Sequence, residues 1–136
     1  MNLKNRTNGE KGQNLVEFAM VVPIFLILVF AIVDFGMGFH AWITVTNAAR
    51  EGARVGAVGA NEATIISKVE NTSGSLNDDN MTITVVNPQG SPGDTVEVTV
   101  AYDYQMITPL STLLGLIGGG FGETIDFDAT SKMRLE

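Results

Sequence analysis

The sequence predicts an α+β fold in which a long N-terminal helix packs, through its distal part, on a small three-stranded antiparallel sheet. An apolar run occupies residues 15–33, and small residues then recur at helical spacing up to about residue 60. The remainder contains three stretches in which apolar and polar residues alternate, which is the pattern of half-buried strands. A three-stranded sheet with one apolar face needs a cover, and the distal part of the helix can supply it.

The apolar run has the length and composition of a membrane span. Glu17 is the only charged residue among the nineteen residues 15–33. At 1.5 Å per residue the run is about 28 Å long, close to the ~30 Å hydrocarbon core of a bilayer. We therefore expect a transmembrane part at about residues 15–34. A carboxylate in such a segment is costly, so Glu17 is a candidate functional residue; the alternative is a hydrated position at headgroup level.

Charges around the apolar run predict its orientation. Lys4, Arg6 and Lys11 precede the run, whereas the next basic residue beyond it is Arg50. By the positive-inside tendency, the N-terminus of this single-pass protein is cytoplasmic and its C-terminal domain is extracytoplasmic. A cleaved secretory signal would have a shorter apolar stretch and a small-residue cleavage site, and the residues after Asp34 offer no such site.

Small residues spaced four apart predict close packing of the distal helix. They fall on two helical stripes, one of Ala48, Gly52 and Gly56 and the other of Ala49 and Ala53. Each glycine weakens a helix by about 1 kcal/mol relative to alanine, so a compensating close contact is expected. The partner is either the protein's own sheet or a neighbouring subunit.

The remaining residues predict an extracytoplasmic α+β head. Residues 61–71 fit a short amphipathic helix with Asn61 as N-cap. Each strand has one apolar face: Met81, Ile83 and Val85; Val96, Val98, Val100, Tyr102 and Tyr104; and Ile125, Phe127, Ala129, Met133 and Leu135. The connection 105–123 is too long for a hairpin. It contains a short helical stretch after Pro109 and a glycine-rich tip. We expect this connection to pack within the domain; the alternatives are a contact with another subunit or with the membrane surface.

Composition argues against several classes of function. After Gly12 the chain has five basic and fourteen acidic residues, a net charge of −9, which disfavours nucleic-acid binding. Cysteine is absent, and His40, beside Trp42, is the single histidine, so Cys–His and Ser–His–Asp catalysis have little to build on. The Asn77–Asn80 segment lacks the spacing of a calcium loop. We therefore expect no catalytic residue, no metal site and no cofactor: the protein is predicted to be non-enzymatic.

Two motifs carry a family resemblance. Gly12 followed by QNLVEF resembles the prepilin-peptidase site of the type IV pilin superfamily. Residues 33–57, VDFGMGFHAWITVTNAAREGARVGA, resemble the TadE-like family, small pilin-like proteins of bacterial tight-adherence pilus systems. The resemblance implies a basic leader, residues 1–12, cleaved between Gly12 and Gln13. It leaves a long helix at 13–60, with Glu17 as the fifth mature residue, and a pilin-like head at 61–136.

The resemblance also implies a function and partners. It indicates a minor pilin or pseudopilin in the inner (cytoplasmic) membrane, needed to assemble a tight-adherence pilus used in cell adhesion. Its partners would be a prepilin peptidase, other pilin-like subunits and the pilus assembly machinery. Cleavage would create an ammonium at Gln13, one helical turn before Glu17, with which it can pair. Two alternatives remain: a principal filament subunit, or a signal-anchored protein with a ligand-binding outer domain and no filament role.

Overall fold

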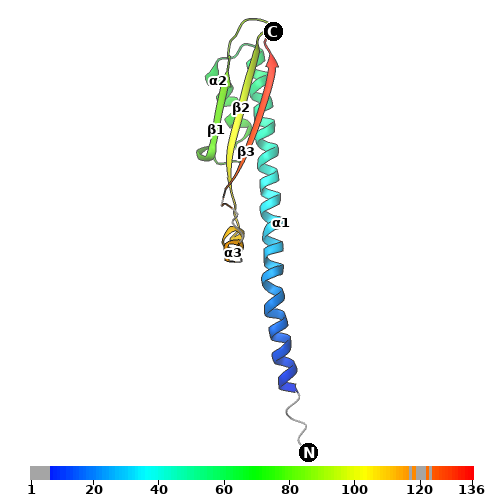
Figure 1. Cartoon of the computed structure of the whole chain (residues 1–136). Helices are drawn as coiled ribbons and strands as arrows, with labels where there is room; N and C mark the ends of the chain where they lie inside the picture. Colours follow the sequence, from blue (N-terminus) through cyan, green and yellow to red (C-terminus); the bar gives the residue numbers. More distant parts are fainter. Residues whose placement is uncertain (1–6, 117, 119–121, 123) are drawn as a thin grey trace, which may run out of the picture.

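The computed structural model describes residues 7–116, 118, 122 and 124–136, and it confirms the predicted α+β class. Its elements are α1 (Thr7–Ala57), α2 (Glu62–Thr72), a 3-10 turn (Asp78–Asn80), β1 (Met81–Val86), β2 (Thr95–Gln105), α3 (Leu110–Leu116) and β3 (Thr124–Arg134). The distal part of α1 lies along the sheet, and its N-terminal part projects well beyond the head (Figure 1).

The three strands form one antiparallel sheet in the order β1-β2-β3. The register pairs Val85 with Val98, and Val100 with Ala129. Alternate residues of the central strand β2 are buried, and they are the apolar set that the alternation predicts: Val96, Val98, Val100, Tyr102 and Tyr104. The sheet therefore turns one apolar face towards the helices and its polar face towards solvent.

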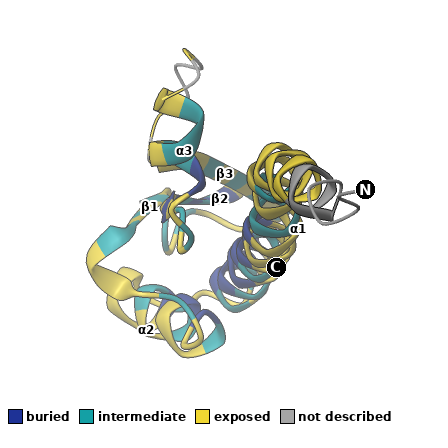
Figure 2. Cartoon of the chain, turned by 90° about the horizontal axis from the view of Figure 1, so that it is seen from below, coloured by how far each residue is buried: buried dark blue, intermediate teal, exposed yellow. Residues whose placement is uncertain are grey.

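Two helices cover the apolar face. Helix α1 contacts β2 and β3, and α2 packs against α1 and β1. Seen from below, the buried residues of α1 lie on the side that faces the sheet, whereas the N-terminal turns are exposed (Figure 2). Helix α2 begins as predicted, because the side chain of Asn61 accepts a hydrogen bond of 2.8 Å from the backbone N–H of Thr64. Its buried residues, Ile65 and Val69, complete the core.

Helix α1 closely approaches the rest of the head at two glycines. A Cβ added to Gly52 would lie 2.6 Å from Cγ2 of Val69, and one added to Gly56 would lie 2.9 Å from Cγ2 of Val96. Those distances are shorter than real carbon contacts, and β-branched valine has little freedom to move aside. The bare backbone at these positions is therefore what brings α1 against α2 and β2.

The end of α1 is marked by another glycine. Gly59 has φ of +81° and donates its N–H to the carbonyl oxygen of Gly56 at 3.0 Å. This is the left-handed conformation that ends many helices and that glycine adopts without strain. Helix α1 consequently stops at Ala57, slightly before the predicted limit at residue 60.

The end of the described chain closes the top of the head. Leu135 is buried and donates its N–H to the carbonyl oxygen of Asp94 at 2.8 Å. The N–H of Glu136 reaches the carbonyl oxygen of Ala57 at 3.1 Å. Residues after β3 are therefore tied both to the β1–β2 connection and to the last turn of α1.

Two predicted segments lie partly outside the described residues. Residues 1–6 of the predicted leader are outside them, and α1 begins at Thr7, so the helix already includes the bond after Gly12. Within the predicted connection 105–123, residues 117, 119–121 and 123 are also outside. The expected short helix of the long connection is α3. Helix α1 continues through Pro23 without a break.

The contact at Gly52 predicts an unusual response to alanine. We expect Gly52→Ala to lower the free energy of unfolding by on the order of 1 kcal/mol. Overpacking costs about 1–3 kcal/mol, which exceeds the gain of about 1 kcal/mol in helix propensity. Circular dichroism of the full chain in detergent, followed through a denaturant titration, measures the difference.

Gly36→Ala is the matched control, because Gly36 is exposed in the same helix and an added Cβ would meet no heavy atom within 4 Å. That variant should be at least as stable as the parent. Equal stability of the two variants would contradict the close contact at Gly52.

Candidate functional site

Within the part of the chain that the structure describes, no residue from 12 to 33 in α1 is buried. Its large apolar side chains are exposed; Leu15, for example, is 71% exposed. Among the described residues, one helix is long and apolar enough to cross a membrane, and none of its most apolar window is buried in the protein. An apolar helix without a protein cover is suited to a bilayer, where all its backbone hydrogen bonds are internal.

The predicted processing residues lie in the first turns of this free helix. Gly12 is exposed, and an added Cβ there would meet nothing within 4 Å. The side-chain amide of Gln13 donates a hydrogen bond of 3.2 Å to Oε1 of Glu17. Residues four apart share one helical face, so α1 presents Gln13 and Glu17 together. Gly12 therefore lies on the helix surface, uncovered by the described residues of the head.

The predicted packing residues lie at the opposite end of α1. Each of them is buried in the head: Ala48, Ala49, Gly52, Ala53 and Gly56. The distance from Glu17 to Ala48 along the helix is about 45 Å at 1.5 Å per residue. The structure therefore does not bring the two predicted groups together.

Asp34 forms the junction between the free helix and the head. It is 6% exposed, and its Oδ1 accepts hydrogen bonds from the backbone N–H groups of Ile107, at 3.0 Å, and Thr108, at 3.2 Å. Oδ2 accepts a short hydrogen bond from the hydroxyl of Thr108. Three donors thus offset the cost of burying this carboxylate. The contact ties the segment that leads into α3 to α1.

Tyr104 adds a fourth bond at the junction. Its hydroxyl donates to the backbone oxygen of Asp34 at 3.3 Å. Burial, and then the nearby negative charge of Asp34, raise the pKa of the Tyr104 hydroxyl above its ordinary value. The hydroxyl therefore keeps its proton, and with it the ability to donate.

A second set of charges lies on the outer side of the helix pair. Glu51 Oε1 lies 2.6 Å from Arg54 in α1 and 3.4 Å from Nζ of Lys68 in α2. The hydrogen bond from Arg54, helped by Lys68, lowers the pKa of Glu51 to about 2. Exposed ion pairs contribute little to stability. These ion pairs therefore add little to the stability of the contact between α1 and α2.

His40 and the acidic turn show simple local contacts. Nε2 of His40 lies 3.4 Å from the hydroxyl of Ser75, and the imidazole is exposed. The side chain of Asn77 caps the short 3-10 turn by accepting from the N–H of Asp79. Within the part of the chain that the structure describes, no group of three or more His, Cys, Asp or Glu side chains is placed to hold a metal ion.

The role of Asp34 is the feature that the sequence did not reveal. Its place after an apolar run indicates a membrane boundary equally well, and its partners follow more than seventy positions later. The available signal was weak: an uncharged stretch, residues 104–122, that contains a Thr-Pro helix start.

Comparison with known families supports the resemblance found in the sequence. A family model described as TadE-like protein matches residues 12–54. The match runs from the predicted processing site through the apolar run and Asp34 to Arg54, and so includes most of α1. No curated protein and no solved structure matches the chain.

The Asp34 junction predicts a local and a global effect of mutation. Asp34→Ala leaves the backbone N–H groups of Ile107 and Thr108 without an acceptor, at a cost of about 1–3 kcal/mol for a buried unsatisfied group. We expect faster amide exchange at these two residues and a lower free energy of unfolding for the full chain in detergent. NMR-detected hydrogen exchange measures the first effect.

Asp103→Ala is the matched control, since Asp103 is an exposed carboxylate in β2, shortly before Ile107 in the chain. Unchanged exchange at Ile107 and Thr108 in Asp34→Ala would show that the two amides do not depend on this carboxylate.

Proposed function

We propose that this chain, which matches the TadE-like family over residues 12–54, is a minor pilin or pseudopilin needed to assemble a tight-adherence pilus. The family is structural and non-enzymatic, and it points to a pilin-like, membrane-anchored protein associated with other pilus components. The observation that carries the proposal is the free apolar helix, with Gly12, Gln13 and Glu17 at its exposed end and a small α+β head at the other.

The proposed location is the inner membrane, with a single span. The three basic residues before the apolar run support a cytoplasmic N-terminus, and the acidic head is then extracytoplasmic. Residues 15–34 of α1 cross the bilayer in this arrangement. The head follows directly, since α1 continues from the span into the core without a break.

Processing by a prepilin peptidase is proposed at the bond between Gly12 and Gln13. The exposure of Gly12 supports this assignment, because the peptidase must reach the backbone there. The bond lies within α1, so the helix must unwind locally before cleavage. Gly9 and Gly12 favour that step, since each glycine weakens the helix by about 1 kcal/mol relative to alanine.

Cleavage would give Glu17 a cationic partner. The new ammonium at Gln13 lies on the helical face that Glu17 shares, as the hydrogen bond between the two side chains indicates. The ammonium and the carboxylate can pair within one chain or between adjacent helices of a bundle. In a bilayer such a pair offsets part of the cost of burying each charge, whereas one charge alone stays uncompensated.

The small residues of distal α1 are proposed to hold the helix on its own head. Ala48, Ala49, Gly52, Ala53 and Gly56 are buried against the sheet and α2, which supports an intramolecular contact rather than a contact with a neighbouring subunit. The exposed N-terminal half of α1 is then the part of the helix that is available for contacts between subunits.

The mature N-terminus tests the processing step. In cells with an active prepilin peptidase, mass spectrometry of the membrane-extracted protein should find Gln13 as the first residue. Gly12→Leu should leave the leader attached, whereas Gly36→Leu, at an exposed glycine of the same helix, should be processed normally.

Two other results would remove this proposal. An intact Met1 in cells with an active peptidase would favour a signal-anchored protein with a ligand-binding outer domain. A first residue beyond Val33 would indicate an ordinary secretory signal.

Glu17→Gln tests the charge pairing, because it keeps the size of the side chain and removes its charge. Cleavage and membrane insertion should survive. Recruitment into the pilus assembly should fall by on the order of tenfold or more, since removing one partner of a buried ion pair costs about 3–5 kcal/mol. Quantification of surface pili and of co-purified pilus components measures the loss.

Glu70→Gln is the control, since Glu70 is an exposed carboxylate of the head. Normal piliation in the Glu17→Gln strain would identify Glu17 as a hydrated residue at the membrane surface.

A further inference from the structure

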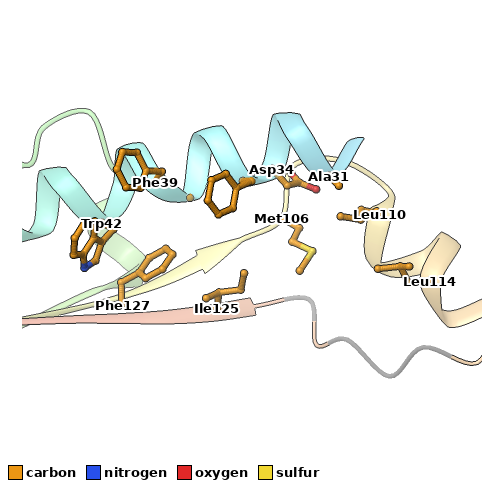
Figure 3. A pocket seen from close by; sticks show the side chains of 11 residues that line it. Ala31, Asp34, Phe39, Trp42, Met106, Leu110, Leu114, Ile125 and Phe127 are labelled. Atoms are coloured by element: carbon orange, nitrogen blue, oxygen red, sulfur yellow. The ribbon is translucent and has the colours of Figure 1, made fainter. Parts of the chain in front are cut away.

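An apolar cavity of about 580 Å³ lies at the base of the head. Figure 3 shows side chains from three elements turned towards it. They include Phe35, Phe39 and Trp42 of α1, Leu114 of α3, and Phe127 of β3. Asp34 also borders the cavity, but its carboxylate oxygens are bonded to Ile107 and Thr108. The cavity therefore offers carbon and almost no polar atom to an occupant.

The apolar surface continues outside the cavity. Phe35, which borders the cavity, is itself 76% exposed, and Leu116 at the end of α3 is 80% exposed. Single exposed apolar residues are ordinary, but a contiguous apolar surface marks a binding site. The exposed apolar side chains of residues 15–33 lie in the same helix as Ala31 and Phe35, which border the cavity.

The cavity lies at the level where the predicted span ends. Ala31, within the span, and Leu114, within α3, border the same cavity. Helix α3 lies beyond the sheet on the side of the N-terminus, next to the middle of α1 (Figure 1). If residues 15–34 cross the bilayer, α3 lies beside the outermost turn of the span, within reach of the outer leaflet.

Two backbone N–H groups of the irregular segment before α3 find an acceptor within the protein. Asp34 accepts the N–H groups of Ile107 and Thr108, and α3 bonds its own backbone as a helix. Residues 104–122 contain no charged side chain. Irregular backbone is tolerated at membrane depth only when its polar groups find partners in the protein. The bonds to Asp34 meet that condition at Ile107 and Thr108.

We propose that residues 105–116 form a membrane finger that inserts into the outer leaflet beside α1, with acyl chains of leaflet lipids filling the cavity between them. The inference rests on the proposed anchoring of α1 in a membrane. Lipid is the occupant because the surface is continuous with the span and lies at its outer end. A second copy of the chain would need to displace lipid from a surface that the bilayer already covers.

The chain is well suited to a site-specific test, because it contains no cysteine. The full chain carrying Leu116→Cys, labelled with an environment-sensitive fluorophore, is reconstituted in phosphatidylethanolamine and phosphatidylglycerol vesicles. We expect emission shifted to the blue and quenching by lipids that carry a nitroxide on the upper part of the acyl chain. Val58→Cys is the matched control, since Val58 is 73% exposed at the far end of α1 and should show neither effect.

Ile24→Cys, in the middle of the predicted span, separates this inference from the membrane anchoring. Quenching at Ile24 without quenching at Leu116 would support the membrane anchoring of α1 and overturn the insertion of residues 105–116. No quenching at either position would overturn both. Quenching or a blue shift at Leu116 that appears only at a high ratio of protein to lipid would identify a second copy of the chain as the occupant and overturn the lipid assignment.

The unlabelled protein gives an independent readout. Trp42 is the only tryptophan and borders the cavity, so acyl chains brominated near the headgroup should quench its emission. Leu116→Asp should reduce that quenching, because a carboxylate opposes insertion of the finger, whereas Val58→Asp should leave it unchanged. Equal quenching in both variants would overturn the proposal; because both positions are exposed, neither substitution should disturb the fold.

Discussion

The close contact between α1 and the rest of the head fixes the direction in which the long helix leaves the head. At Gly52 and Gly56 the helix backbone meets valines of α2 and β2 without an intervening side chain. Since α1 is one continuous helix, the direction fixed there also sets the path of its free half. The positions of Glu17 and of the bond after Gly12 relative to the head follow from packing at the opposite end of the helix.

The same helix has to suit two surroundings, and Asp34 lies where they meet. Beyond Asp34, α1 contributes small buried residues to a protein core; before it, the helix exposes bulky apolar side chains. A carboxylate at such a boundary would be costly if it were buried without donors. Its bonds to Ile107 and Thr108 remove that cost and, at the same time, hold α3 beside the helix.

Short-range patterns in the sequence correctly predicted features that depend on neighbouring residues. Alternation in β2 identified its buried face, Asn61 was found as an N-cap, and the family match over residues 12–54 agrees with the motif found there. The contact between Asp34 and Thr108 was not predictable in the same way. It depends on the chain turning back after β2, and nothing in the residues around Asp34 distinguishes a tether from a membrane boundary. The structure begins α1 at Thr7, so residues 7–12 of the predicted leader lie in the same helix as the apolar run.

The bonds made by the residues after β3 have a consequence for biosynthesis. Leu135 completes the core and Glu136 is bonded to the end of α1, so the head cannot close until these residues have been translated. Until then the valines and alanines of distal α1 have no partner from β3. The apolar run leaves the ribosome about a hundred residues earlier, at a time when the rest of the chain is still unfolded. An unfolded head is the form that a translocation channel can pass, so the order of elements fits the membrane-anchored, pilin-like protein proposed above.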